Sequence, residues 1–364
     1  MLILSLSLIK GRQPVKYNFC RSSDFSKELA EKGKIVLNEQ SSGRYANMSQ
    51  WVLMATVLLL FSVSYFLIIM SYVSYFSALG AIIVGFFCYI IVAAIGHDAA
   101  HKSVSKINFV NRFAVFFSFT LIGVSGALWA KRHIRIHHQV PNVVGNEIDG
   151  DGSAVLRFHE GQEWKPWHRF QPIYAPMLYL IVLLYTAWVD DFAFLKKELS
   201  HTNKKTTVIL EFIATKILHI ILAVVLPLLY FNARPEMVLV CYLIATMSAS
   251  FLFVIFNIGT HINIHSKIIN ADLDNNLDHD WAMHQVKTTV NWSPENKIAG
   301  LLTGGVNAHV THHLFPYAAH CHNTELAKLV NRVSVKHAVT LNVISFKEMI
   351  KGHFSLIKQL AKPA

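Results

Sequence analysis

The sequence predicts an all-α integral membrane protein with about four membrane-spanning helices and a histidine-rich domain on the cytoplasmic face. Only 15% of its 364 residues are charged and 53% are hydrophobic, whereas a soluble domain carries about 25% charged residues. Mean hydropathy is +0.38. Eight of the 20 histidines gather in three clusters. Together these features indicate a membrane protein with polar chemistry at one face.

The first 50 residues form a polar, basic segment with eight Lys or Arg against four Asp or Glu. The stretch SSDFSKELAEKGKIVL predicts a helix with Asp24 or a neighbouring serine as its N-cap. The apolar start MLILSLSLI is followed, not preceded, by basic residues, so it is not typical of a secretory signal. It suits a short interfacial anchor or a wrongly assigned start. We predict that residues 1–50 are a cytoplasmic segment and residues 51–364 the membrane domain.

The spans follow from the charge-free runs. Residues 51–96 contain no charged side chain over 46 positions, and a span needs about 20 residues, which predicts helices near 51–70 and 77–96. Two more spans are expected near 208–231 and 237–258, around an Arg-Pro-Glu turn at 234–236. If the runs at 113–130 and 170–189 dip in or lie along the interface, four crossings leave both termini cytoplasmic. The basic N-terminal flank agrees with this orientation.

The chain contains three histidine clusters: HDAAH (97–101) at the end of the second span, RHIRIHH (132–138) after the third apolar run, and HVTHH (309–313) in the polar C-terminal part. Side chains three or four residues apart share one face of a helix, so the histidines of each cluster are expected to point together. A single pair four residues apart often arises by chance. Three clusters with eight of the 20 histidines indicate a metal site; these are His97, His101, His133, His137, His138, His309, His312 and His313.

A ninth candidate, His261, follows the last predicted span and is four residues after Asn257. We prefer it to His265. Nine imidazoles are too many for one ion and suit two, and imidazole binds iron, zinc, copper or nickel. A thiolate site is not expected because the four cysteines are far apart and no CxxC pair occurs. Histidines beside long apolar helices favour oxygen chemistry on a lipid chain by two iron ions, and no feature suggests nucleic-acid binding.

The three clusters, in this order and after two spans, resemble the histidine boxes of the membrane fatty-acid desaturases, within them the linoleoyl-CoA desaturase-like branch. The likeness covers most of the chain. It extends through HHQVPNVVGNEIDGD, WHRFQPIYAPMLY, WAMHQVKTTVNW and GGVNAHVTHHLFP. A lone HxxxH would be a weak signal, but three boxes with this order and spacing are specific.

The resemblance implies a cytoplasmic di-iron centre, with O₂ as co-substrate and the acyl chain in a tunnel between the spans. The box histidines and His261 would be the iron ligands, with no catalytic residue separate from them. Asp98 would be a carboxylate that orients a ligand histidine, or simply a solvated acid. Glu147, Asp149 and Asp151 would support the ligands or simply form a polar loop. Trp281, His284 and Gln285, in a motif shared with this branch, would be structural or face the substrate.

Two departures from the family pattern affect the expected partners and products. Many relatives that desaturate towards the carboxyl end begin the third box with Gln, whereas His309 stands here. Many eukaryotic relatives carry a cytochrome b5 domain with a His-Pro-Gly-Gly motif, which this sequence lacks. Electrons are therefore expected from a separate ferredoxin or cytochrome b5. An acidic donor would suit the net charge of +11.

Three functions remain open from the sequence. A desaturase acting on a fatty acyl thioester or a membrane lipid is favoured over a hydroxylase or an acetylene-forming oxidase with the same ligands. Position of the double bond, chain length and acyl carrier (CoA, carrier protein or lipid) stay open. A metal transporter is disfavoured, because transport sites lie at mid-membrane between spans and the charge-free runs lack such residues. His219 is the exception, and we interpret it as a hydrogen-bonded core histidine.

Overall fold

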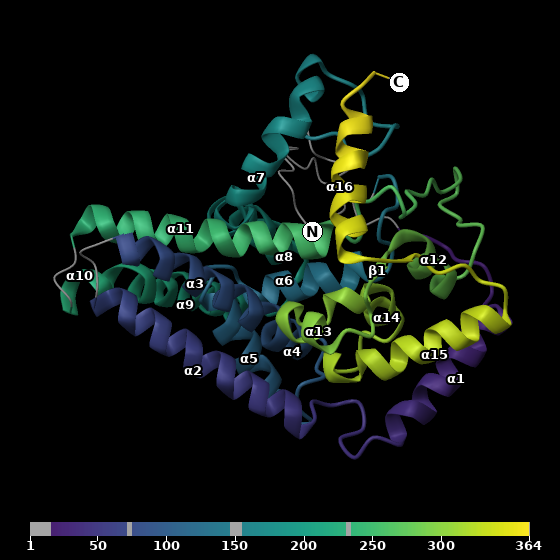
Figure 1. Ribbon diagram of the computed structural model, residues 1–364, viewed down its shortest axis with the longest axis horizontal. Coiled ribbons are helices and arrows are strands. Elements are labelled where there is room, and N and C mark those ends of the chain that lie inside the picture. The colour runs from purple at the N-terminus through teal and green to yellow at the C-terminus, as the bar shows by residue number, and fades with distance from the viewer. Residues whose placement is uncertain (1–15, 71–74, 146–154, 231–233, 364) are drawn as a thin grey trace. The chain divides into compact units, whose positions relative to one another are not determined.

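A computed structural model describes residues 16–70, 75–145, 155–230 and 234–363. The described chain is almost entirely helical (Figure 1). It divides into two compact units. The first, here called the membrane unit, comprises residues 46–131 and 178–254. The second, called the histidine unit, comprises residues 1–45, 132–177 and 255–364.

Long apolar helices make up the membrane unit. In chain order its helices are α2 (Met48–Met70), α3 (Tyr75–Ile91), α4 (His97–Ala100), α5 (Asn108–Thr120), α6 (Gly126–Arg132), α8 (Asp191–His201), α9 (Lys205–Ile220), α10 (Leu226–Tyr230) and α11 (Pro235–Phe253). Single π-helical turns interrupt them at Val92–Gly96, Thr186–Asp190 and Ile221–Val225. Helix α7 (Gln171–Tyr185) begins in the histidine unit and ends in the membrane unit.

Helix α3 is the centre of the membrane unit, because it packs against both α2 and α11. Gly85 allows the close crossing with α11, since a Cβ there would lie 2.2 Å from the carbonyl oxygen of Ala245. Small residues let membrane helices approach in this way. The outer face of α2 stays apolar, with Leu59 63% and Phe66 54% exposed. A continuous exposed apolar face of this kind suits contact with lipid.

Five described helices are long and apolar enough to cross a membrane. Four of them, Met48–Ile68, Ser77–Ala100, Lys205–Leu229 and Pro235–Ile258, correspond to the four spans expected from the sequence. The fifth, Pro166–His201, contains the apolar run at 170–189 that the sequence analysis assigned to the interface. The predicted class, an all-α integral membrane protein, is confirmed.

Shorter helices build the histidine unit. They are α1 (Asp24–Asn38), α12 (Trp281–Thr288), α13 (Lys297–Thr303), α14 (His309–Leu314), α15 (Asn323–Lys336) and α16 (Phe346–Leu360). Two π-helical turns, His133–His137 and Val254–Ile258, and three 3₁₀ turns, Pro166–Phe170, Val306–Ala308 and His320–His322, complete it. Strands β1 (Asn291–Trp292) and β2 (Val343–Ile344) pair in parallel, with Asn291 opposite Val343.

The core of the histidine unit supports the third histidine cluster. Figure 1 shows α1 alongside α15, and their apolar faces meet the inner face of α14. Phe25 from α1, Leu326 from α15, and Val310 and Leu314 from α14 are all buried in this cluster. Ser23 caps α1 by accepting the Ser26 N–H, which confirms the predicted helix and its serine cap. Because Val310 and Leu314 on one face of α14 pack into this apolar cluster, the histidines of α14 lie on its other face.

Candidate metal centre

Four buried histidines of the histidine unit converge on one point. The ligand nitrogens of His137, His261, His309 and His313 all lie within 4.8 Å of one another. The π-helical turn supplies His137, the segment after Val254–Ile258 supplies His261, and α14 supplies the other two. His309 and His313 are four residues apart and therefore share a face of α14. Three segments, each more than 40 residues from the next in the chain, thus bring their imidazole nitrogens together in one cluster.

In this first group the Nε2 atoms of His261 and His309 are 3.0 Å apart. Nδ1 of His261 lies 3.2 Å from the Thr288 carbonyl oxygen. A carbonyl can only accept, so Nδ1–H donates and the neutral ring keeps a bare Nε2. Two imidazole nitrogens at this distance need a proton or a cation between them. The arrangement fits a metal ion bound by both rings.

The ring of His313 is oriented so that its Nε2 is available to bind a metal. Its Nδ1–H donates to Oε1 of Gln285 at 2.8 Å, which again leaves Nε2 bare. The residue is fully buried, and within the described chain Nε2 has no hydrogen-bond partner. Burial, together with the neighbouring His138 and His309 rings, holds the pKa of His313 well below its usual value. The ring is therefore neutral, as metal binding requires.

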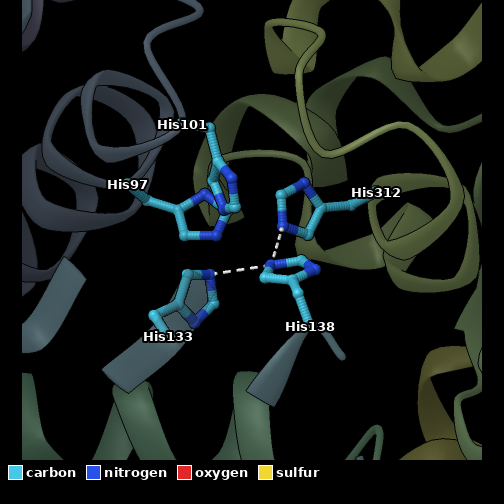
Figure 2. Close-up of side chains that lie close together, drawn as sticks. All are labelled: His97, His101, His133, His138 and His312. Atoms are coloured by element: carbon cyan, nitrogen blue, oxygen red, sulfur yellow. Dashed lines mark hydrogen bonds between the residues drawn. The ribbon is translucent and has the colours of Figure 1, made fainter. Parts of the chain in front are cut away.

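A second group in the same unit contains His133, His138 and His312. Figure 2 shows Nε2 of His138 between the other two rings, 3.0 Å from Nε2 of His133 and 3.1 Å from Nε2 of His312. The ligand atoms of these three residues lie within 4.8 Å of one another. Three imidazoles with facing Nε2 atoms form a second candidate metal position.

The π-helical turn explains how the second cluster divides between the groups. The His138 N–H bonds to the His133 carbonyl, which is the i to i+5 bond of a π-turn. His133 therefore joins His138, whereas His137 joins the first group. The rings of His133 and His137 stack at 5.2 Å, as expected of two side chains on one helical face, although their ligand atoms belong to different groups. His312 likewise separates from His309 and His313.

The first predicted box lies in the membrane unit. His97 and His101 occupy one face of α4 and its C-cap, with ring centroids 5.0 Å apart. Figure 2 draws this pair as well. Asp98, the residue after His97, is buried. Its Oδ2 accepts a hydrogen bond from Nε2 of Gln50 at 2.8 Å. Its Oδ1 lies 3.8 Å from Nδ1 of His97, which is beyond hydrogen-bond distance.

Two asparagines that sequence reasoning missed hold the ligand segments in place. Nδ2 of Asn142 lies 2.7 Å from the His261 carbonyl and 3.2 Å from the Thr288 carbonyl. It thereby fixes both His261 and the group that orients its ring. Oδ1 of Asn291 accepts the Val310 N–H at 2.8 Å, at the start of α14. Asn142 stands in the quoted HHQVPN stretch, but its spacing carries no signal of this role.

Helix α12 supports the segment that follows the second box. Trp281 donates from Nε1 to the His138 carbonyl at 3.2 Å, and His284 donates from Nε2 to the Pro141 carbonyl at 2.8 Å. Gln285 lies 3.5 Å from the Gln139 carbonyl and also orients His313. These three residues, left between two roles by the sequence, all contact backbone or ligand atoms of the site.

The remaining candidates lie elsewhere. His265 is exposed, whereas His261 is buried in the first group, in agreement with the choice made from the sequence. His219 is buried in the membrane unit and bonds to the Thr120 carbonyl and the Tyr242 hydroxyl, as expected of a satisfied core histidine. Three acidic candidates fall outside the described residues, as does the apolar N-terminal run: Glu147, Asp149 and Asp151.

Comparison with known proteins agrees with this geometry. Residues 73–345 match the family model described as "Fatty acid desaturase". An sn-1 linoleoyl-lipid 6-desaturase of Arthrospira platensis is 26% identical over 95% of both chains. One of the same name from Synechocystis sp. is 27% identical over 74% of this chain and 76% of its own. A probable Delta(5) fatty acid desaturase C of Dictyostelium discoideum is 28% identical over 72% and 59%. The chain belongs to the fatty acid desaturase family and is a membrane oxidoreductase.

Proposed function

We propose that the protein introduces a double bond into a fatty acyl chain, with O₂ and two iron ions held by histidines. The observation that carries the proposal is the presence of two imidazole groups with facing Nε2 atoms 3.0–3.1 Å apart, in which every ring except the half-buried His133 is buried. Two nitrogens bound at about 2.1 Å to one ion, at right angles, lie about 3.0 Å apart. The spacing fits ligands that share an ion better than it fits imidazoles packed without one.

In this proposal each group holds one ion. His137, His261, His309 and His313 hold the first; His133, His138 and His312 hold the second. We assign His97 and His101 to the second ion, because the HxxxH spacing and the family pattern support it. When bound, the irons supply the oxidising chemistry that no side chain provides. The role of Asp98 is to hold the first box in place through Gln50.

The protein's own residues orient the ligands and keep water away. The Thr288 carbonyl and the Gln285 amide fix the ring protons of His261 and His313 on Nδ1, so that Nε2 faces the ion. His137, His138, His309 and His313 are all buried. A buried, pre-oriented site protects a reactive centre from side reactions.

For substrate and partners we propose an acyl chain carried on a membrane lipid, and electrons from a separate ferredoxin or cytochrome b5. The substrate class is supported by the names of the two linoleoyl-lipid relatives and by the apolar outer face of α2. The active site is proposed to face the cytoplasm. The basic N-terminal flank of the first span supports that orientation.

The test is expression in a host of defined lipid composition, followed by mass spectrometry that locates new double bonds and separates lipid classes. A new double bond in lipid-bound chains, absent with His137→Ala, is the expected result. Hydroxylated chains without new double bonds would show that the protein is a hydroxylase and not a desaturase. New double bonds that appear first in acyl-CoA would overturn the lipid-bound substrate.

A further inference from the structure

A buried lysine stands in the apolar helix α9 of the membrane unit. Lys216 is only 7% exposed, and its ammonium group uses all three of its donors. These bonds reach the Gly123 carbonyl at 2.6 Å, the Ala187 carbonyl at 2.6 Å and Oδ2 of Asp191 at 2.8 Å. An ionisable group in a membrane segment is expensive to keep and usually serves a function.

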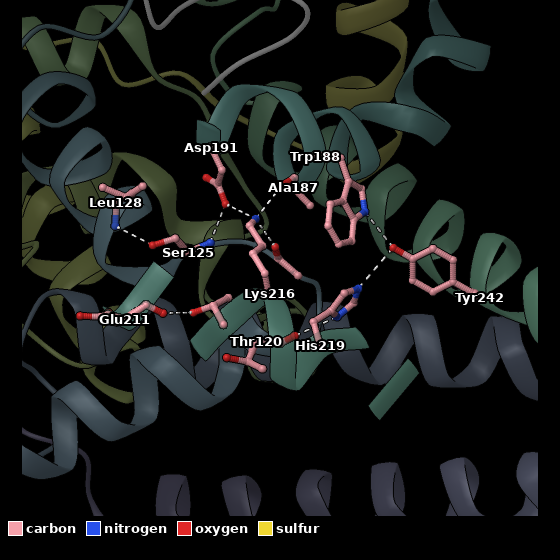
Figure 3. A network of polar contacts seen from close by, with 12 residues as sticks. Thr120, Ser125, Leu128, Ala187, Trp188, Asp191, Glu211, Lys216, His219 and Tyr242 are labelled. Atoms are coloured by element: carbon pink, nitrogen blue, oxygen red, sulfur yellow. Dashed lines mark hydrogen bonds and ion pairs between the residues drawn. The ribbon is translucent and has the colours of Figure 1, made fainter. Parts of the chain in front are cut away.

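Asp191 connects this lysine to another helix. It is completely buried, and the same Oδ2 that accepts from Lys216 also accepts the Ser125 backbone N–H at 2.7 Å. Figure 3 shows Asp191 between Lys216 and Ser125. The Lys216 ammonium lies over three aromatic rings, 4.9–5.6 Å from their centres: Trp188, Phe192 and Phe212. The ion pair is therefore sealed from water and fixed in one geometry.

Ser125 is the residue at which helix α6 begins. The Trp129 N–H donates to its carbonyl at 2.9 Å, and the Leu128 N–H reaches its Oγ at 3.4 Å. The Ser125 N–H that Asp191 accepts is the one a capping-box carboxylate normally takes from within the helix. A carboxylate here also complements the helix dipole. Asp191 thus fixes the start of α6 from a different helix.

Helix α6 leads directly to the second histidine cluster and contacts the first. It continues without a break into the π-helical turn His133–His137. Trp129, one turn after the cap, packs against Phe119 at 4.6 Å and against His97 at 6.0 Å between ring centres. A rotation of α6 at its cap would therefore move His133, His137 and the ring that borders His97.

We propose that Asp191 and Lys216 are positioning residues, which hold helix α6 in the rotation that sets the histidines of the second cluster. The inference rests on the proposed metal centre and goes beyond it, because neither residue is a metal ligand. The feature that matters is the acceptor Asp191 offers to Ser125. Lys216 neutralises that buried carboxylate and fixes its direction.

The test uses two doubly substituted proteins that both remove the ion pair. Lys216→Met with Asp191→Asn keeps an acceptor for the Ser125 N–H. The second protein combines Lys216→Met with Asp191→Leu. Leucine is close in size to asparagine but offers the Ser125 N–H no acceptor. Removing both charges of a buried pair avoids the penalty of leaving one unpaired, so both variants are expected to insert and melt cooperatively.

Iron per chain, measured by mass spectrometry on purified protein, is the first measurement, and product formation is the second. The asparagine variant should bind iron as the unsubstituted protein does. The leucine variant should lose iron affinity by roughly tenfold or more, with activity falling in parallel. Equal iron binding by the two folded variants would overturn the proposal, as would loss of iron by the asparagine variant.

If the leucine variant does not melt cooperatively, alanine at position 191 in the Lys216→Met background replaces it, since alanine also lacks an acceptor and adds no bulk. Full iron binding by that variant would equally overturn the proposal. A protein without substitutions that binds no iron would contradict the proposed function instead, so the two failures are distinguishable.

Discussion

His261 and His309 bring their Nε2 atoms to 3.0 Å although they are 48 residues apart in the chain. The Thr288 carbonyl orients one ring, and the start of α14, held by Asn291, orients the other. The contact therefore depends on three separate segments of the histidine unit.

Substitution at His309 separates ligand chemistry from packing. His309→Ala removes a ligand nitrogen and should lower product formation at least about 100-fold, because one ion loses a first-coordination group. His309→Gln places an amide oxygen near the same position and should retain a measurable part of the activity. Product analysis by mass spectrometry, with iron per chain, checks both. Equal activity of the Ala and Gln variants would exclude a ligand role.

Gln285 is expected to act through His313. Gln285→Leu leaves the Nδ1–H of His313 without its acceptor, so the ring is free to change tautomer, and iron affinity should fall roughly 10- to 100-fold. Gln285→Glu keeps an acceptor at the same place and serves as the matched control. Iron titration of the metal-free proteins measures the difference. Unchanged affinity in the leucine variant would show that Gln285 only fills space.

Asn142 should affect stability and the metal centre together. Asn142→Ala removes the amide donor that reaches the buried carbonyls of His261 and Thr288, while Ser266 and the His261 ring still donate to them. The expected cost is about 0.5–1.5 kcal/mol for each lost hydrogen bond. Thermal melting of the metal-free protein checks this. Asn291→Ala, which releases the Val310 N–H instead, is the comparison. A melting temperature unchanged in the Asn142 variant would contradict the assigned role.

His353 predicts a loss of stability in acid. It is buried in α16, its Nδ1–H donates to the Ile262 carbonyl, and burial lowers its pKa from 6.5 to about 4. The unfolded chain therefore takes up a proton first, so stability falls as pH drops from 6.5 and the loss is complete below about pH 4. The full effect is on the order of 3 kcal/mol.

His353→Gln removes the titrating group and keeps a donor for the Ile262 carbonyl. Its thermal midpoint should depend less on pH than that of the unsubstituted protein between pH 6.5 and 4, with little difference at neutral pH. Parallel pH profiles for the two proteins would mean that His353 contributes nothing to acid sensitivity.

The long apolar helices and the use of histidine as the ligand type could be predicted from the sequence, because both depend on local patterns. Apolar runs predicted four of the five long apolar helices, and Ser23, a serine next to Asp24, caps α1 as one of the two expected alternatives. Burial of His261 and exposure of His265 also follow the choice made from the position of the last span.

Tertiary contacts decided the rest. A regular helix places His133 with His137, but the π-helical turn places His133 with His138, and no sequence pattern marks that turn. Asn142 and Asn291 act on backbone groups more than 15 residues away, so their roles exist only in the folded chain. The Lys216–Asp191 pair likewise depends on two helices meeting.

The central claim is a centre of two irons on histidine nitrogens, and metal analysis of the purified protein with iron X-ray absorption tests it most directly. The account predicts two irons per chain with nitrogen ligands at about 2.1 Å, and a lower iron content in both His137→Ala and His312→Ala. Full desaturase activity with one iron or none per chain, or with unchanged iron in both variants, would contradict it.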